Sequence, residues 1–336
     1  MRRVPTALVP RRLPPEAVPL EPERAAAVAR LAAGARGAST NRAYAWGWGV
    51  FERWCAMEGR IPLPADAETI KSFVASQVAR VPAPAWASLG IQLAAVSTAH
   101  RHARCWNPVS DPDLHDVLTG ARRALGVAAR APKAPAAEAE LEAMIAGIDR
   151  TTLEGKRDAA VLLVGFHSAL RRSNLAALEC ADFSPTPGGL AIHIRRSKTD
   201  QTGEGRVIGI AEHGGPLCAV EALREWWQAA GITDGLAFRA FAFDGVTVLD
   251  HFGARTVERI VQRYAAAAGL NPRRFGGHSL RAGFVTEAIR RGAGDAEIMG
   301  TTLHASANML VRYRREADPV ARGASRRMKL GKDKAP

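Results

Sequence analysis

Residues that could hold a phosphate group and attack it lie in the C-terminal part of the chain. In the stretch GHSLRAGF, His278 and Arg281 are three residues apart at what reads as a helix start. Residues at this spacing share one face of a helix, and the free N–H groups of a helix start favour anions. A solvated polar face would have the same composition, so the pair by itself leaves both interpretations open.

Tyr313 is the one tyrosine of three that lies in a cationic stretch, NMLVRYRREAD. Tyr44 and Tyr264 fall on apolar stripes at helical spacing, and we expect both in the core. A tyrosine can act as a covalent nucleophile. Since its free pKa is about 10, neighbouring cations would help to form the phenolate. An amphipathic residue at a helix end is the alternative interpretation of Tyr313.

Three further residues could take part in phosphate chemistry, although each has an ordinary alternative. Arg171 lies where one predicted helix ends and Ser173 could cap the next, and its planar fork suits phosphate oxygens. Lys198 lies in a predicted hairpin turn, from which it could protonate a leaving oxygen. His304 precedes Tyr313 by nine residues. A surface arginine near a helix end and a solvated lysine are the alternatives for the first two.

The charge of the whole chain favours a polyanionic partner. Its 336 residues carry a net charge of +13, with a pI near 10.4, and 47% of them are apolar. Nucleic acid and an acidic membrane surface both fit such a charge, which does not determine a fold. No apolar run approaches the roughly 20 residues of a membrane span, and the proline-broken N-terminus lacks a secretory signal. We therefore expect a cytoplasmic protein.

Neither a nucleotide cofactor nor a metal ion is indicated. The sequence has no GxGxxG opening a helix and no GxxxxGK[ST] motif. The four cysteines are scattered without close pairs, which argues against a zinc site and against a disulfide framework. We expect no cofactor and no bound metal.

The elements that must position the candidate residues are mostly helical. Apolar spacing predicts a first helix that starts with the N-cap types Ser39, Thr40 and Asn41. Further helices are predicted over 68–80, 87–104, 112–125, 216–230, 254–269, 279–291 and 306–315. Alternating apolar residues over 190–194, followed by a polar glycine-containing segment and 207–210, predict a β-hairpin. The predicted fold class is therefore mainly α with a small hairpin or sheet.

Composition divides the chain into two expected domains. Residues 126–140 contain Pro, Ala and two basic residues with little periodicity, as in a linker, and both ends of the chain are basic. We expect a flexible tail over 1–37, a helical domain over 38–126, a linker over 127–137, a second domain over 138–325 and a basic tail over 326–336.

Taken together, the candidate residues resemble the motif set of the tyrosine recombinase, or phage-type integrase, family. The family pattern is an arginine in a helix–turn–helix, a lysine in a β-turn, a HxxR box, a His or Trp, and a tyrosine nine residues later. The matching residues, in order, are Arg171, Lys198, His278, Arg281, His304 and Tyr313. Each signal alone is weak, whereas six in register on a basic chain are specific. The resemblance covers roughly 39–325.

The resemblance implies a site-specific DNA recombinase whose helical core-binding domain and mixed α/β catalytic domain clamp DNA. It implies that Tyr313 attacks the scissile phosphate and forms a 3′-phosphotyrosyl link without metal, ATP or cofactor. The other implied roles are proton donation to the leaving oxygen by Lys198, binding of the non-bridging oxygens by Arg171 and Arg281, proton transfer at the tyrosine by His278, and a hydrogen bond to the phosphate from His304.

The partners that the resemblance implies are double-stranded DNA with specific sites, a homotetramer on that DNA, and accessory factors. Basic residues of the helical domain are candidate DNA contacts, each with a solvated helix face as the alternative. These residues are Arg101, His102, Arg104, Arg122 and Arg123.

The sequence departs from the family pattern in two places. Asn174 stands three residues after Arg171, where the family usually has an acidic residue, and Thr-Thr-Leu precedes His304 in place of the usual glycine. Two other functions remain open at this point. A type IB topoisomerase or telomere resolvase would share the tyrosine chemistry, and a non-catalytic DNA-binding protein could share the scaffold.

Overall fold

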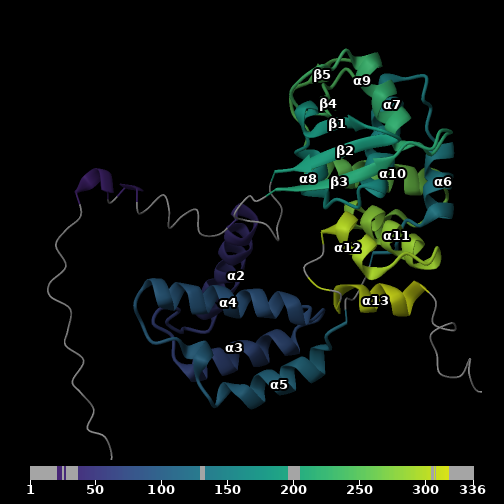
Figure 1. Ribbon diagram of the computed structural model, residues 1–336. Coiled ribbons are helices and arrows are strands. Elements are labelled where there is room, and N and C mark those ends of the chain that lie inside the picture. Colours follow the sequence, from purple (N-terminus) through teal and green to yellow (C-terminus); the bar gives the residue numbers. More distant parts are fainter. Residues whose placement is uncertain are drawn as a thin grey trace, which may run out of the picture. The chain divides into compact units, whose positions relative to one another are not determined.

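The structure, a computed structural model, describes most of the chain and divides it into two compact units, residues 1–130 and 131–336 (Figure 1). The described residues are 21–24, 26–27, 37–128, 133–195, 205–303, 306 and 308–317. Among them, no helix combines the length and the apolar character needed to cross a membrane.

The first unit is helical throughout its described residues. Its helices are α2 (Ala38–Met57), α3 (Ala67–Ala79), α4 (Trp86–His102) and α5 (Leu114–Leu125), with a 3₁₀ turn at Pro108–Ser110. Helix α2 packs against α4, and α3 packs against α5. Phe51 of α2 and Phe73 of α3 are fully buried with their rings edge to face, 5.1 Å between centroids. This geometry favours aromatic pairs and gives the unit a core of its own.

The predicted helices of this unit are confirmed to within two residues at either end, but the predicted N-cap of the first helix is wrong. Ser39, Thr40 and Asn41 lie inside α2, which begins at Ala38 after Gly37 without a side-chain cap. Glycine tolerates the extended conformation of an N-cap, so the polar residues enter the first turn.

Tyr44 is only half-buried, and its assignment to the core is wrong. It lies one turn before Gly47, where α2 meets the backbone of α4 so closely that an added Cβ would lie 3.1 Å from Ile91 O. The core of the unit therefore begins one turn later along α2 than the apolar stripe suggests.

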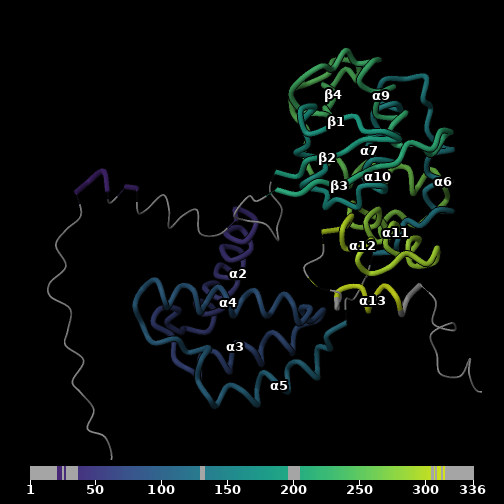
Figure 2. The backbone as a smooth tube through the Cα atoms, viewed as in Figure 1, coloured from purple at the N-terminus to yellow at the C-terminus, as the bar shows by residue number. Residues whose placement is uncertain are grey.

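The second unit packs helices against one face of a three-stranded antiparallel sheet, the face that carries Ile192 and Ile208 (Figure 2). Its strands are β1 (Phe183–Thr186), β2 (Gly189–Ile194) and β3 (Arg206–Ala211), with a separate pair, β4 (Ala240–Phe241) and β5 (Val248–Leu249). Its helices are α6 (Glu138–Ala146), α7 (Leu153–His167), α8 (Arg172–Ala176), α9 (Ala219–Ala230), α10 (Ala254–Ala267), α11 (Gly277–Arg290), α12 (Asp295–Thr302) and α13 (Asn308–Ala317), with 3₁₀ turns at Cys180–Asp182 and Pro272–Arg274.

The predicted β-hairpin is confirmed as β2 and β3, in a register that pairs Ile192 with Ile208. Strand β1 was not predicted, because its sequence FSPT contains a proline and lacks alternating apolar residues. The hairpin turn, including the predicted catalytic Lys198, lies outside the described residues.

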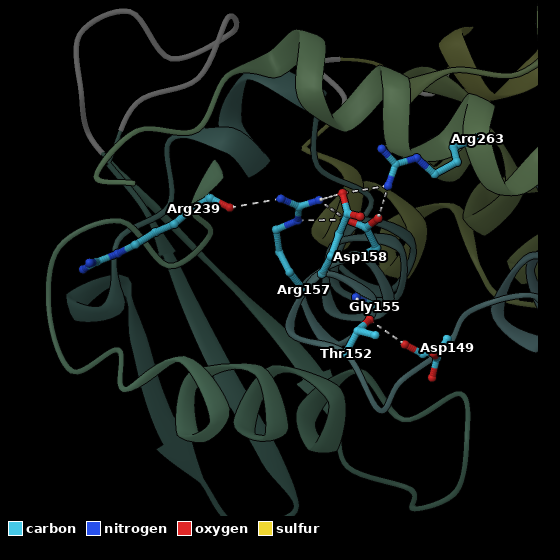
Figure 3. Close-up of polar contacts among 8 residues, drawn as sticks. Asp149, Thr152, Gly155, Arg157, Asp158, Arg239 and Arg263 are labelled. Atoms are coloured by element: carbon cyan, nitrogen blue, oxygen red, sulfur yellow. Dashed lines mark hydrogen bonds and ion pairs between the residues drawn. The ribbon is translucent and has the colours of Figure 1, made fainter. Parts of the chain in front are cut away.

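Helix α7 is the centre of the second unit, because it is buried on nearly every side between α9 and α11. Its first turns carry a buried ion pair in which Arg157 donates to Asp158 Oδ1 from Nε at 2.8 Å and from Nη2 at 2.6 Å (Figure 3). Arg263 of α10 reaches the same carboxylate, with 3.4 Å between Nη1 and Oδ2. The predicted burial of Tyr264, beside Arg263, is confirmed, with 8% of the residue exposed. This cluster fixes α7 against α10.

Candidate active site

Helix α11 carries the HxxR residues, and glycines set both its start and its packing. Gly276 precedes the helix, and its N–H donates to Ser279 Oγ at 3.1 Å. The predicted helix began at residue 279, after His278. In the structure α11 begins at Gly277, so His278 is its second residue and the predicted start is two residues late. A Cβ at Gly283 would lie 1.7 Å from Ala136 O, so only glycine lets α11 lie directly against residues 134–137.

Arg281 is buried within this packing without a carboxylate partner. Only 2% of the residue is exposed. Its Nη1 donates to Ala169 O at 2.7 Å, while its buried Nη2 has no hydrogen-bond partner among the described residues. Burial and the positive charge of Arg171 lower the pKa of Arg281 to about 10. A buried guanidinium with an unused donor can bind an external anion.

The turn between α7 and α8 brings Arg171 to the same place. Ala169 adopts a left-handed φ of 49°, uncommon for a residue other than glycine, and its carbonyl receives Arg281. Arg171 is the residue before α8, and its carbonyl accepts the N–H groups of Asn174 at 2.8 Å and Leu175 at 3.0 Å. Ser173 lies inside α8, so the predicted cap at Ser173 is wrong: Arg171 takes the cap position.

Tyr313 lies on α13, which packs against α11. Its hydroxyl is 3.2 Å from Nε2 of His278, within hydrogen-bond distance. The phenol is half-buried and His278 is exposed. The Coulombic interaction with Tyr313 also raises the pKa of Arg281. The HxxR helix therefore places a base and a cation next to the same tyrosine.

Helix α13 is held in place by two contacts that do not involve the tyrosine hydroxyl. Val285 of α11, Ile298 of α12 and Leu310 of α13 form a small buried apolar cluster. Arg314, a neighbour of Tyr313 in sequence, forms an ion pair with Asp295 at the start of α12. Arg314 thus anchors the helix, and the buried cation that interacts with Tyr313 is Arg281.

The structure brings four of the six predicted catalytic residues together, and the other two lie outside its described residues. Arg171 and Arg281 interact through their charges, Arg281 with Tyr313, and Tyr313 with His278. Lys198 and His304 are the two that fall outside the described part of the chain.

The five candidate DNA contacts lie on the first unit at the C-terminal ends of two helices. Arg101 and His102 end α4, Arg104 follows with a left-handed φ of 56°, and Arg122 and Arg123 lie in the last turn of α5. All five are exposed, and none forms an ion pair with another described residue.

Sequence reasoning missed the contacts that hold the start of α11. Lys133 donates from Nζ to the carbonyls of Arg273 at 2.8 Å and Phe275 at 2.9 Å. The N–H of Ala136 donates to Ser279 O at 2.9 Å. Lone lysines and alanines in a Pro- and Ala-rich segment carry no sequence signal for such a role.

Comparisons with known proteins find relatives over most of the chain. The model of the phage integrase family matches residues 136–319. An integrase/recombinase XerD homolog of Selenomonas ruminantium is 32% identical over 86% of this chain and 85% of its own length. Recombinase Cre of Escherichia phage P1 is 24% identical over 79% of this chain and 80% of its own length. Among solved structures, a lambda integrase tetramer bound to a Holliday junction matches with a TM-score of 0.56 and 17% identity, over 88% of this chain and 76% of that one.

Proposed function

Because the chain belongs to the phage integrase family of tyrosine recombinases, we propose that Tyr313, His278, Arg281 and Arg171 form the site at which it acts. The chain is a site-specific DNA recombinase, an enzyme that breaks and rejoins DNA strands. The observation that carries the assignment is the phenol of Tyr313, 3.2 Å from His278 Nε2 and next to the buried Arg281.

The two arginines bind the scissile phosphate. The free Nη2 of Arg281 and the guanidinium of Arg171 donate to its non-bridging oxygens, where negative charge increases in the transition state. The hydrogen bond from Arg281 to Ala169 O holds this guanidinium in position, so little reorganisation of it accompanies the reaction. Positioning and fixed positive charge are the main sources of rate enhancement in phosphoryl transfer.

The chemical step is a transesterification at phosphorus. His278 Nε2 accepts the proton of Tyr313 as the phenol oxygen forms a bond to phosphorus, and the bond from phosphorus to the 5′ oxygen breaks. The products are a 3′-phosphotyrosyl link and a free 5′-hydroxyl, whose proton comes from Lys198. The number of phosphoester bonds is conserved, so a second strand can be joined by the reverse reaction. His304 donates a hydrogen bond to the phosphate.

The proposed assembly is a homotetramer on two double-stranded DNA sites, acting with accessory factors in the nucleoid. Lambda integrase is seen as a tetramer on a Holliday junction, and a net charge of +13 suits a DNA partner. We assign residues 38–126 to core binding and 138–325 to catalysis. The five exposed basic residues at the ends of α4 and α5 are the proposed phosphate contacts of the core-binding domain.

Trapping on nicked DNA tests this function. The protein is incubated with a pool of duplexes of randomised sequence that carry a nick, so that cleavage releases a short fragment and cannot be reversed. Adducts that survive denaturation are recovered, the attached DNA is sequenced, and the modified residue is mapped by mass spectrometry. We expect a phosphotyrosine at Tyr313 and a shared sequence at the attachment point.

The matched control for Tyr313→Phe is Tyr264→Phe, because Tyr264 lies in the core of the same unit. Tyr313→Phe should form no adduct, and Tyr264→Phe should form as much as the unaltered protein. An adduct on Tyr313→Phe would disprove the assignment of the nucleophile. Attachment without any sequence preference, together with relaxation of supercoiled plasmid, would indicate a topoisomerase.

A further inference from the structure

The residue after Arg171 links three helices of the site, and we propose that the ion pair between Arg172 and Glu258 positions Arg171 for catalysis. Arg172 is the first residue of α8, and Glu258 lies on α10. This inference rests on the proposed role of Arg171 as a phosphate ligand. Neither Arg172 nor Glu258 touches the reacting atoms, so both are positioning residues.

Arg172 is held at both ends of its side chain. Its guanidinium Nη1 forms an ion pair with Glu258. Its stem packs against the first residue of α11, since a Cβ at Gly277 would lie 2.7 Å from Arg172 Cβ and 3.2 Å from its Cδ. The side chain therefore lies between α10 and the start of α11, the helix that carries His278 and Arg281.

Glu258 also faces the segment that leads into α11. A Cβ at Gly276 would lie 3.4 Å from Oε1 of Glu258 and 3.6 Å from Cε of Lys133. Lys133 in turn donates to the carbonyl of Phe275. The Glu258 carboxylate thus contacts α8 through Arg172 and also lies against Gly276, the residue that precedes α11. It therefore helps to fix the position of Arg171 relative to that of Arg281.

Arg171 depends on this link because no carboxylate holds it directly. Position 174, one turn into α8, is a neutral asparagine, and Arg171 forms no ion pair within the described part of the chain. Its carbonyl is fixed by the N–H groups of Asn174 and Leu175. The direction of its side chain therefore follows the orientation of α8, which depends on the core packing of Leu175 and on the contacts of the Arg172 side chain.

The exposure of the pair separates positioning from folding. Side-chain exposure is 48% for Arg172 and 29% for Glu258, and exposed ion pairs contribute little to stability. In contrast, a displacement of about 1 Å in a catalytic group can lower a rate by roughly 100-fold. Loss of the pair should therefore reduce the rate of cleavage far more than it reduces stability.

Single-turnover cleavage of the nicked duplex identified by trapping tests the proposal. Glu258→Gln removes the charge and keeps the shape of the side chain, and Arg172→Met keeps its stem. Glu212→Gln is the matched control, because Glu212 pairs with Arg224 at 2.9 Å on the surface of the same unit. We expect Glu258→Gln and Arg172→Met each to cleave roughly 10- to 100-fold more slowly at saturating protein, with unchanged DNA affinity and thermal midpoint, and Glu212→Gln to behave as the unaltered protein.

Two further readouts distinguish positioning of Arg171 from a general loss of order. The double variant should be no slower than either single variant, because both disrupt one interaction. The second readout uses a duplex whose scissile phosphate carries a methyl group in place of one non-bridging oxygen. This phosphate is neutral, so its reaction depends less on the positive charge of Arg171. The defect of Glu258→Gln should therefore shrink on that duplex.

Equal rates for Glu258→Gln and Glu212→Gln would overturn the proposal, as would additive effects in the double variant or an undiminished defect on the neutral phosphate. These outcomes presuppose that the unaltered protein forms the Tyr313 adduct. If it forms none, the proposed function itself fails, and the two failures are thereby distinguished.

Discussion

Two buried arginines in the same unit have opposite surroundings. Arg157 is 3% exposed and Arg281 is 2% exposed. Arg157 donates twice to Asp158 (Figure 3). It also pairs with Glu154 at 3.2 Å and lies 4.7 Å from the ring centroid of Phe241. Among the described residues, Arg281 has one carbonyl partner, an unused Nη2 and no carboxylate.

The difference separates an arginine that stabilises the fold from one that is kept for a ligand. A buried charge is costly unless it is paired and hydrogen-bonded, and the protein pairs Arg157 internally. Burial and Arg171 instead lower the pKa of Arg281 to about 10, so keeping it charged at neutral pH costs folding energy on the order of 3 kcal/mol. That cost is recovered only when an anion binds, and the proposed anion is the scissile phosphate.

Arg281→Met should have the largest effect, and it should be on activity. Removing a preorganised cation from the phosphate lowers cleavage by roughly 1,000-fold, measured as single-turnover adduct formation. The free energy of unfolding should change by less than about 1 kcal/mol, because relief of the buried charge offsets the lost hydrogen bond to Ala169. Urea unfolding measures this second quantity, and a destabilisation of several kcal/mol would show that Arg281 belongs with Arg157.

Arg157→Met should reverse this pattern. It leaves Asp158 buried with Arg263 and the hydroxyl of Tyr264 as its remaining partners, and the free energy of unfolding should fall by about 3 kcal/mol. Cleavage by the fraction that remains folded should be unchanged. Burial already raises the pKa of Asp158, so lowering the pH should protonate its unpaired carboxyl and reduce the destabilisation. A loss of cleavage per folded molecule would contradict the division between the two arginines.

The sequence alone predicts many of the helices and the candidate catalytic residues, but not the contacts that hold these residues in place. The order Arg171, His278, Arg281 and Tyr313 was readable because reactive residue types at fixed spacing are rare. In the second unit, apolar periodicity predicted α9, α10, α11 and α13 to within three residues, but it did not predict α6 or α12. The link from Arg172 to Glu258 was not readable, because an exposed arginine and glutamate 86 residues apart look like ordinary surface charges.

The structural role of the Arg157 cluster is also testable by pH. Burial, with Asp158 beside it, raises the pKa of Tyr264 to about 12. A phenol whose pKa is raised by folding adds stability that is complete below its unfolded value, near 10, and is lost as the pH rises toward 12. Unfolding in urea at pH values from 9 to 11.5 should therefore show an alkaline loss of stability on the order of 2 kcal/mol that is missing in Tyr264→Phe. Identical pH profiles for the two proteins would remove Tyr264 from the cluster.

The smallest expected effect is on the binding of a free anion, and it compares the two arginines most directly. Inorganic sulfate is a tetrahedral oxyanion, with the geometry of the scissile phosphodiester and one more negative charge, and it should bind between Arg281 and Arg171. At ten times its dissociation constant, a ligand specific for the folded state adds about 1.4 kcal/mol of stability.

High concentrations of sulfate stabilise proteins in general by exclusion from their surfaces, so the titration is kept in the low millimolar range at constant ionic strength. The thermal midpoint should rise with sulfate for the unaltered protein and for Arg157→Met, and should stay constant for Arg281→Met. Equal shifts for both variants would mean that sulfate binds elsewhere and that the unpaired Nη2 of Arg281 is not an anion site.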